Sequence, residues 1–182
     1  IGLTAGMLVT LLGILALILG YLQSRTIQQQ LQTRGLAIAQ SLASISTTDL
    51  LTYNYVALER SANRTVQSPD IIYVIFHDKE GRVAGYSERP DLQNTFLPDE
   101  NSQRALQSAK PLTQQVFLRS LNLVGLDIAV PVFPPGINER WGTVRVCLSL
   151  MPMYRQIRQV YTAILIIGLL AIMVGTLVSI WV

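Results

Sequence analysis

Arginine side chains are the residues of this sequence best suited to recognise a ligand. The 14 basic residues are twelve arginines and two lysines, and the planar guanidinium fits carboxylates and phosphates. Arg145 falls within a predicted strand and Arg119 directly follows another, where a charged side chain needs a partner, a ligand or water. A carboxylate-bearing small molecule is therefore one expectation. The alternative is that both arginines are solvated or paired with Asp127 or Glu139.

Three aromatic residues of predicted strands, Tyr73, Tyr86 and Phe117, could line a pocket between the sheet and its loops. Aromatic strand residues are also common in an ordinary core, so this alternative stays open. Together with Arg119 and Arg145, they form the set of candidate ligand-binding residues.

Metal and catalytic chemistry have little support in the sequence. His77 is the only histidine, and without a second histidine or a cysteine nearby it makes a poor metal site. We expect it to be a solvated residue of a hairpin turn. Cys147 is the only cysteine, so no intrachain disulfide is expected. No nucleophile, base or metal cluster is evident, and we expect no enzymatic activity, metal or cofactor in this segment.

Two apolar runs without any Asp, Glu, Lys or Arg frame the polar part of the chain, at residues 1–22 and 161–182. Half of all residues are hydrophobic, and the mean hydropathy is +0.38. A helix of 22 residues at about 1.5 Å per residue spans roughly the ~30 Å core of a bilayer. We therefore predict a transmembrane helix over 1–22, a water-exposed domain over 23–149, and a juxtamembrane lead with a second transmembrane helix over 150–182.

Small residues recur within both predicted spans. They are Gly6, Gly13 and Gly20 in the first, and Ala171, Gly175 and Ser179 in the second. Such spacing allows close helix packing in lipid, which would suit a homodimer, although glycine is also simply frequent in membrane helices. The formal charge of +3 comes from scattered residues and gives no reason to expect a nucleic-acid partner.

The polar part begins with a predicted long helix over residues 23–67, which ends at Pro69. Its apolar residues recur every three to four positions, so one face must be buried against the domain or against a second copy. This stripe consists of Leu31, Ile38, Leu42, Ile45 and Val56.

Five strands are predicted after the long helix. They cover residues 71–76, 83–87, 113–118, 126–133 and 141–150, with a short helix over 100–108. The fold class is α+β, with the long helix packed on a five-stranded antiparallel meander. In the last strand Val144, Val146, Leu148 and Leu150 alternate with Thr143, Arg145, Cys147 and Ser149. We expect the aliphatic face to lie against the helix and the mixed face to look toward a pocket or loops.

Three blocks of sequence carry a resemblance to a known family. Residues 73–83 (YVIFHDKEGRV) are similar to its strand, Asp-x-x-Gly turn and strand, residues 128–132 (IAVPV) to its apolar strand ending in proline, and residues 141–150 (WGTVRVCLSL) to its closing strand. On these blocks the chain resembles the single Cache (PAS-like) sensor domains of bacterial receptor kinases, nucleotide cyclases and chemoreceptors. Cys147 departs from the pattern, in which glycine is common.

The resemblance implies a sensor domain held outside the cytoplasm by the bacterial inner membrane and most naturally homodimeric. A small molecule would bind the sheet face away from the long helix, and binding would shift the last strand and the second spanning helix. A cytoplasmic kinase, cyclase or chemotaxis output would follow in the full protein. The alternative is a structural or accessory membrane protein whose extracytoplasmic domain binds another protein.

Overall fold

The computed structural model describes residues 28–119 and 121–151, together with five isolated positions at 13, 162, 166, 168 and 173. The predicted spans over 1–22 and 161–182 therefore lie almost wholly outside the described residues, as do the small residues in them apart from Gly13. Among the described residues, no helix is both long enough and apolar enough to cross a membrane.

The helical part that precedes the sheet consists of three segments: a helix over residues 28–45, α2 (Thr47–Leu51) and α3 (Tyr55–Thr65). The prediction of one unbroken helix over 23–67 is therefore wrong. Tyr53 has a φ of 53°, a left-handed conformation typical of residues that end a helix. Asn54 then begins α3, because its side chain accepts a hydrogen bond from the backbone N–H of Ala57.

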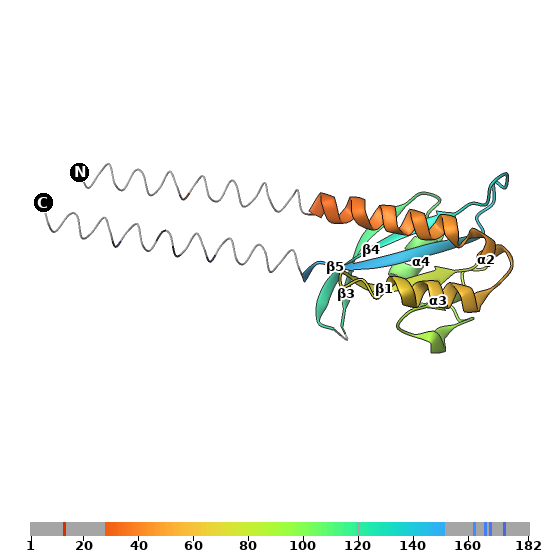
Figure 1. Ribbon diagram of the computed structural model, residues 1–182, viewed down its shortest axis with the longest axis horizontal. Helices are drawn as coiled ribbons and strands as arrows, with labels where there is room; N and C mark the ends of the chain where they lie inside the picture. The colour runs from red at the N-terminus through yellow and green to blue at the C-terminus, as the bar shows by residue number, and fades with distance from the viewer. Residues whose placement is uncertain are drawn as a thin grey trace, which may run out of the picture. The chain divides into compact units, whose positions relative to one another are not determined.

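The sheet has five antiparallel strands in the order β2-β1-β5-β4-β3 (Figure 1). They are β1 (Ile71–His77), β2 (Val83–Tyr86), β3 (Leu112–Leu118), β4 (Leu123–Val132) and β5 (Gly142–Ser149). The predicted meander is wrong in one respect, because β5 lies between β1 and β4 instead of at the edge. Every residue of β5 is buried, which suits the centre of a sheet covered on both faces.

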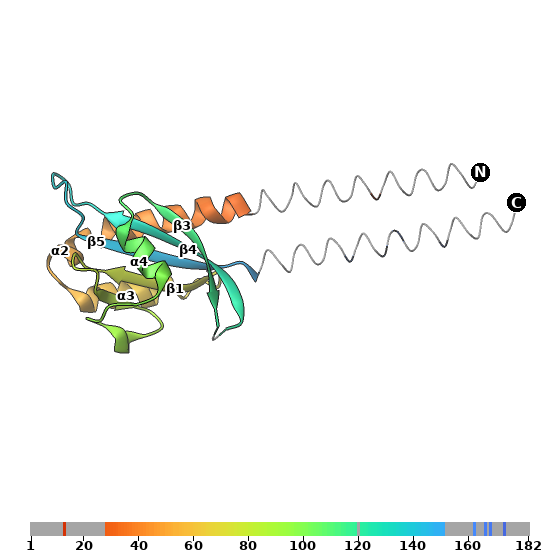
Figure 2. The same ribbon diagram turned by 180° about the vertical axis from the view of Figure 1, so that it is seen from behind.

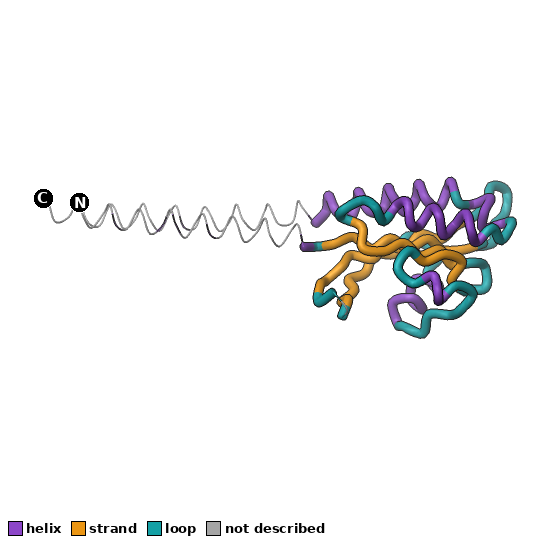
Figure 3. Tube along the Cα trace, turned by 60° about the horizontal axis from the view of Figure 1, so that its bottom comes forward, coloured by secondary structure: helices purple, strands orange, loops and turns teal. Residues whose placement is uncertain are grey.

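The two faces of the sheet are covered by different elements (Figure 3). The helix over 28–45 and α3 lie on one face. The other face carries α4 (Glu100–Gln107), which packs against β3, β4 and β5. Figure 2, which views the molecule from behind, shows α4 in front of the sheet. A short 3₁₀ helix, η1 (Pro90–Leu92), lies in the loop between β2 and α4.

The main hydrophobic core lies between the sheet and the helical layer. Val144, Val146 and Leu148 of β5 are fully buried there with Ala39 and Leu42 of the helix over 28–45. The predicted packing of the aliphatic face of β5 against the helix is confirmed.

The predicted apolar stripe is buried only in its first part. Leu31 and Ile38 pack against the core along with Leu42. Ile45 and Val56, in contrast, are 65% and 59% exposed. Ile45 is still in the first helix but lies outside the face that Ala39, Leu42 and Ala43 bury. Val56 comes after the break between α2 and α3, where the chain changes direction.

Candidate ligand-binding face of the sheet

The face of the sheet that α4 covers is unusually polar for a buried surface. Antiparallel register places Ile75 opposite Arg145 and Gln114 opposite Asp127, so their side chains share this face. Asp127 in turn lies opposite Cys147. Strand alternation therefore gathers one charged or amide side chain from each of β3, β4 and β5 beneath α4.

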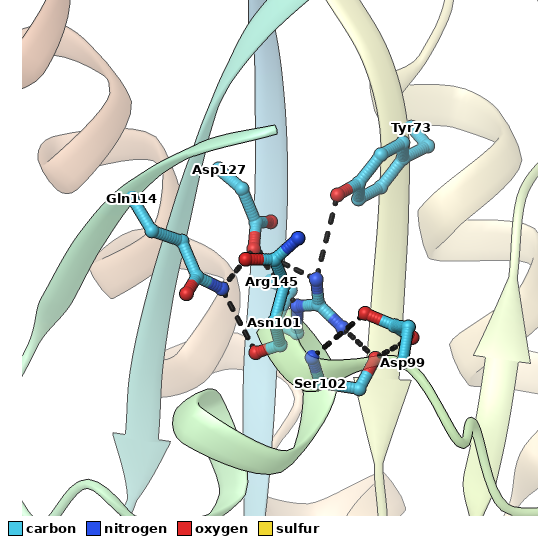
Figure 4. A network of polar contacts seen from close by, with 7 residues as sticks. All are labelled: Tyr73, Asp99, Asn101, Ser102, Gln114, Asp127 and Arg145. Carbon is cyan, nitrogen blue, oxygen red and sulfur yellow. Dashed lines mark hydrogen bonds and ion pairs between the residues drawn. The ribbon is translucent and has the colours of Figure 1, made fainter. Parts of the chain in front are cut away.

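Arg145 and Asp127 form a buried ion pair at the centre of this face (Figure 4). Asp127 Oδ2 accepts from Arg145 Nη2 at 2.7 Å and from Arg145 Nε at 3.1 Å. The side chains are only 2% and 0% exposed. Although burial by itself would lower the pKa of Arg145, the charge of Asp127 outweighs it and the pKa is raised. The guanidinium therefore stays charged, and its positive charge is balanced by the Asp127 carboxylate.

Helix α4 adds three polar residues to the network (Figure 4). Asp99 begins the helix, because its Oδ1 accepts from the backbone N–H of Ser102 at 2.9 Å. The Ser102 hydroxyl donates to Asp99 Oδ2 at 2.5 Å and accepts from Arg145 Nη1. The backbone carbonyl of Asn101 accepts from Gln114 Nε2 at 2.9 Å. The start of α4 is thus tied to both β5 and β3.

Two tyrosines complete the apolar side of the network. Tyr73 of β1 is 3% exposed, and its hydroxyl lies 3.5 Å from Arg145 Nη2. Tyr86 of β2 meets the Tyr73 ring edge to face, with 5.9 Å between ring centroids. Burial and the nearby Asp127 charge raise the pKa of Tyr73, and burial raises the pKa of Tyr86 to about 12. Both phenols are therefore neutral hydrogen-bonding groups at physiological pH.

His77 is buried on the same face, so the expectation of a solvated turn histidine is wrong. It is the last residue of β1, is 0% exposed, and lies opposite Thr143. Its Nδ1 lies 3.2 Å from the carbonyl oxygen of Gly81, an acceptor, so Nδ1 carries the proton and donates. Burial, with a contribution from the Arg145 charge, lowers the pKa of His77 to about 3.

Several buried polar atoms on this face have no hydrogen-bond partner. Among the residues that the structure describes, the atoms of this kind are His77 Nε2, Gln114 Oε1, Asp127 Oδ1, Trp141 Nε1 and Thr143 Oγ1. Trp141 directly precedes β5 and is two residues from Thr143, so alternation puts all five on the face under α4. Unpaired buried polar groups are rare in native proteins, and their concentration on one face marks it as the candidate ligand site.

The structure brings together three of the five predicted site residues, namely Tyr73, Tyr86 and Arg145. Phe117 is three positions from Gln114 in an unbroken strand pairing, so it points to the opposite face, where it is 57% exposed. Arg119 lies in the exposed turn beyond the end of β3. The alternative that an arginine pairs with Asp127 is confirmed for Arg145.

The prediction missed Gln114, Ser102 and Asp99 as members of the site. Asp99 and Ser102 show a helix-start pattern, but nothing in it indicates that the helix would cover the sheet. The sequence around Gln114 predicts a strand, but a glutamine occurs on the solvent face of a sheet as well as on a buried one. Its position therefore did not indicate that it belongs to the site. In the described parts of the chain, no group of three His, Cys, Asp or Glu residues is placed to hold a metal ion.

The first testable consequence concerns the ion pair. Arg145→Met leaves the Asp127 carboxylate buried without its cation, and we expect a loss of about 3–5 kcal/mol in the free energy of unfolding. The double variant Arg145→Met/Asp127→Leu removes both charges and should lose clearly less than Arg145→Met alone. Denaturant unfolding of the chain in detergent micelles measures both. A double variant that loses as much unfolding free energy as Arg145→Met and Asp127→Leu added together would contradict the pair.

The second consequence concerns His77. Its pKa is about 3 when folded and 6.5 as the reference value, so the unfolded chain binds more protons between these pH values. The stability due to the neutral imidazole is fully present above pH 6.5 and is lost as the pH falls toward 3, by up to about 1.4 kcal/mol per pH unit. His77→Gln should have a shallower loss of unfolding free energy between pH 7 and pH 5. Parallel curves for the two proteins would show that His77 is not buried and neutral.

Comparison with known proteins identifies the fold. No family model and no curated protein sequence matches the chain. Solved structures do match, including the sensor domain of E. coli DcuS, with a TM-score of 0.57 and 16% identity over 71% of this chain and 96% of that one. The sensor domain of the V. cholerae histidine kinase DctB matches with a TM-score of 0.64 and 11% identity, covering 80% of this chain and 58% of that one.

The sensory domain of the Campylobacter jejuni chemoreceptor Tlp3, solved with isoleucine bound, matches with a TM-score of 0.58 and 12% identity. The match covers 85% of this chain and 62% of the Tlp3 domain. The chain thus spans about three fifths of the DctB and Tlp3 domains and nearly all of the DcuS domain. At these identities the likeness concerns the fold, and the described domain has the fold of single Cache (PAS-like) sensor domains.

Proposed function

We propose that this chain is the sensing segment of a bacterial membrane receptor and that a small molecule binds the face formed around Arg145 and Asp127. The observation that carries the proposal is the set of five unpartnered polar atoms on this face. A buried polar group without a partner costs about 1–3 kcal/mol, so a ligand that supplies the missing partners would be stabilised by that amount at each contact.

The fold supports a sensing role. The structures that the chain resembles are sensor domains of histidine kinases and chemoreceptors. The Tlp3 domain has been solved with isoleucine, L-valine and 4-methylisoleucine, so this fold accommodates small molecules in that protein. The described domain also brings together no catalytic constellation, which agrees with a binding role for this segment.

Strand β5 is the proposed route of the signal. It carries Arg145, pairs with both β1 and β4, and ends at Ser149, after which the chain enters residues 150–182. A ligand that moves β5 relative to its neighbours would move the start of the predicted second span as a piston, tilt or rotation. A cytoplasmic kinase, cyclase or chemotaxis module would read that motion.

We further propose that the domain lies outside the cytoplasm at the inner membrane and that the receptor is a homodimer. The two charge-free runs of 22 residues support membrane insertion. Gly6, Gly13 and Gly20, together with Ala171, Gly175 and Ser179, would pack the spanning helices closely. Arg25, Arg155 and Arg158 by themselves favour a cytoplasmic domain, but a loop this long crosses membranes largely regardless of charge.

Ligand binding is tested by thermal unfolding of the chain in detergent micelles against a mixed library of amino acids, dicarboxylates, amines and sugars. At least one compound at millimolar concentration should raise the unfolding midpoint by about 2 °C or more. The same compound should leave Arg145→Met/Asp127→Leu unchanged, because that variant lacks the polar centre of the face. A flat response to the whole library would contradict the proposed function.

Membrane placement is tested by labelling a new cysteine in intact bacterial spheroplasts. Lys110→Cys places a thiol on an exposed loop, whereas the native Cys147 is 0% exposed and serves as the internal control in the unmodified chain. A membrane-impermeant maleimide should label Lys110→Cys before lysis and the unmodified chain at neither stage. Labelling that requires lysis would place the domain in the cytoplasm.

A further inference from the structure

The helical layer contains a cavity of its own. α2 joins the helix over 28–45 to α3 at one end of this layer (Figure 1), and a cavity of about 320 Å³ lies between these elements. Arg60, Ser61 and Arg64 line it from α3, and Ser46 and Asp49 line it from the other side. The helical layer and α4 cover opposite faces of the sheet (Figure 3), so this cavity is separate from the face that α4 covers.

Two arginines of α3 give the cavity its charge. Arg60 and Arg64 are four residues apart, so they lie on the same face of the helix, and both residues are exposed. Neither guanidinium forms an ion pair or a hydrogen bond with the part of the chain that the structure describes. Like charges at this spacing destabilise a helix. An anion bound between them would remove that repulsion.

Ser46 provides an observation that does not depend on the arginines. Basic residues toward the end of a helix are common on protein surfaces, so they do not mark a site by themselves. Ser46 lines the same cavity and is only 2% exposed. Its hydroxyl does not cap α2 and forms no hydrogen bond with any described residue. The residue is enclosed except at the cavity, so a partner for this hydroxyl must come from there.

The polar groups that line the cavity are mainly donors. Guanidinium groups only donate, and the hydroxyls of Ser46 and Ser61 can donate as well. Asp49 is the one carboxylate in the lining, and its Oδ1 already accepts from Asn54 Nδ2 at 3.2 Å. The remaining charged residue of α2 and α3, Glu59, lies outside the lining and next to β2. Two positive charges and one negative charge leave the lining at +1, which favours an anion.

The number of donors distinguishes between two kinds of anion. Two guanidinium forks and two hydroxyls offer more donors than the roughly four acceptor positions of a carboxylate can use. A phosphate monoester presents three strongly accepting oxygens and up to two negative charges. We propose that this cavity binds a phosphate monoester, with Arg60 and Arg64 on its charged oxygens and Ser46 and Ser61 as neutral donors. Ile45, which also lines the cavity, is 65% exposed and available to the organic part of the ester.

The position of the cavity favours an ester from solution over the headgroup of a lipid. Ile45 lies 17 residues after Gln28, which is about 25 Å along the helix. In the proposed membrane arrangement the first span joins the domain at Gln28. The cavity is therefore at the end of this helix that is remote from the span.

The experiment measures binding to the chain in non-ionic, phosphate-free detergent micelles by calorimetry. The soluble probes are inorganic phosphate, glycerol 3-phosphate, glycerol and succinate. The two phosphates should bind with millimolar or tighter dissociation constants, and about tenfold or more tightly than succinate at the same site, whereas glycerol should not bind there. In a further arm phosphatidic acid is added to the micelles as a lipid source of the same group, and it should not compete with glycerol 3-phosphate.

Point variants assign the contacts. Arg60→Gln and Arg64→Gln each remove one guanidinium and should weaken phosphate binding about fivefold. Ser46→Ala removes the enclosed hydroxyl and should weaken it about threefold. Asp49→Asn removes the repelling carboxylate and should strengthen binding about threefold at low salt. The matched control is Arg104→Gln, which removes the same charge from an exposed arginine of α4 and should leave the affinity unchanged.

The outcomes separate a built site from general attraction. Weaker binding in Arg60→Gln and Arg64→Gln together with stronger binding in Asp49→Asn supports the site, because a loss of fold cannot change affinity in both directions. Equal weakening by Arg104→Gln, or phosphate binding that ignores Arg60→Gln and Arg64→Gln, overturns it. No phosphate binding at all overturns it as well.

Two further results test the class and the source of the ligand. Succinate that binds as tightly as phosphate, and equally depends on Arg60, overturns the assignment to a phosphate. Competition by phosphatidic acid overturns the assignment to a soluble ester. None of these results decides the proposed sensing function, which concerns the other face of the sheet and is tested with the mixed library.

Discussion

The buried ion pair between Arg145 and Asp127 is the constraint on which the rest of the domain depends. Two charges in the interior are costly unless additional polar groups in fixed places meet most of their remaining hydrogen-bonding capacity. Gln114 and Ser102 provide them, and Ser102 belongs to the helix that covers the sheet. The pair therefore positions α4 on β3 and β5 as well as joining β4 to β5.

Strand β5 serves both the fold and the site because its side chains alternate. Val144 and Val146 bury one face against the helical layer, and Arg145 between them faces α4. A shift of β5 by one residue would put the guanidinium in the aliphatic core and the valines under α4. The register is thus strongly specified, and a ligand that acts on Arg145 acts on the strand that the whole sheet holds in place.

The sequence predicts those features that depend on local pattern. The alternation in β5, the hairpin at residues 71–87 and the helix at 100–107 follow from periodicity and turn residues, and all are present. The break at Tyr53 coincides with the Asn54 cap, a local signal that is easily missed within a continuing apolar periodicity. The central place of β5 depends on tertiary packing, which local propensity does not encode. The partner of Arg145 depends on the register between β4 and β5. His77 shows the same limit, because a residue at the end of a strand is solvated or buried according to what covers it.

The pairing of Arg145 with a residue of its own chain also sets what the face can recognise. An arginine kept free for an anion would be a costly buried charge whenever the ligand was absent. Asp127 removes that cost because its carboxylate neutralises Arg145 within the same chain. A ligand would therefore be selected by the polar atoms of this face that have no partner. Those atoms are the acceptors Asp127 Oδ1, Gln114 Oε1 and His77 Nε2, the donor Trp141 Nε1, and the Thr143 hydroxyl, which can donate or accept. The charge of Arg145 is thus neutralised within the chain, and the atoms left without a partner on this face are hydrogen-bonding groups of both kinds, acceptors and donors.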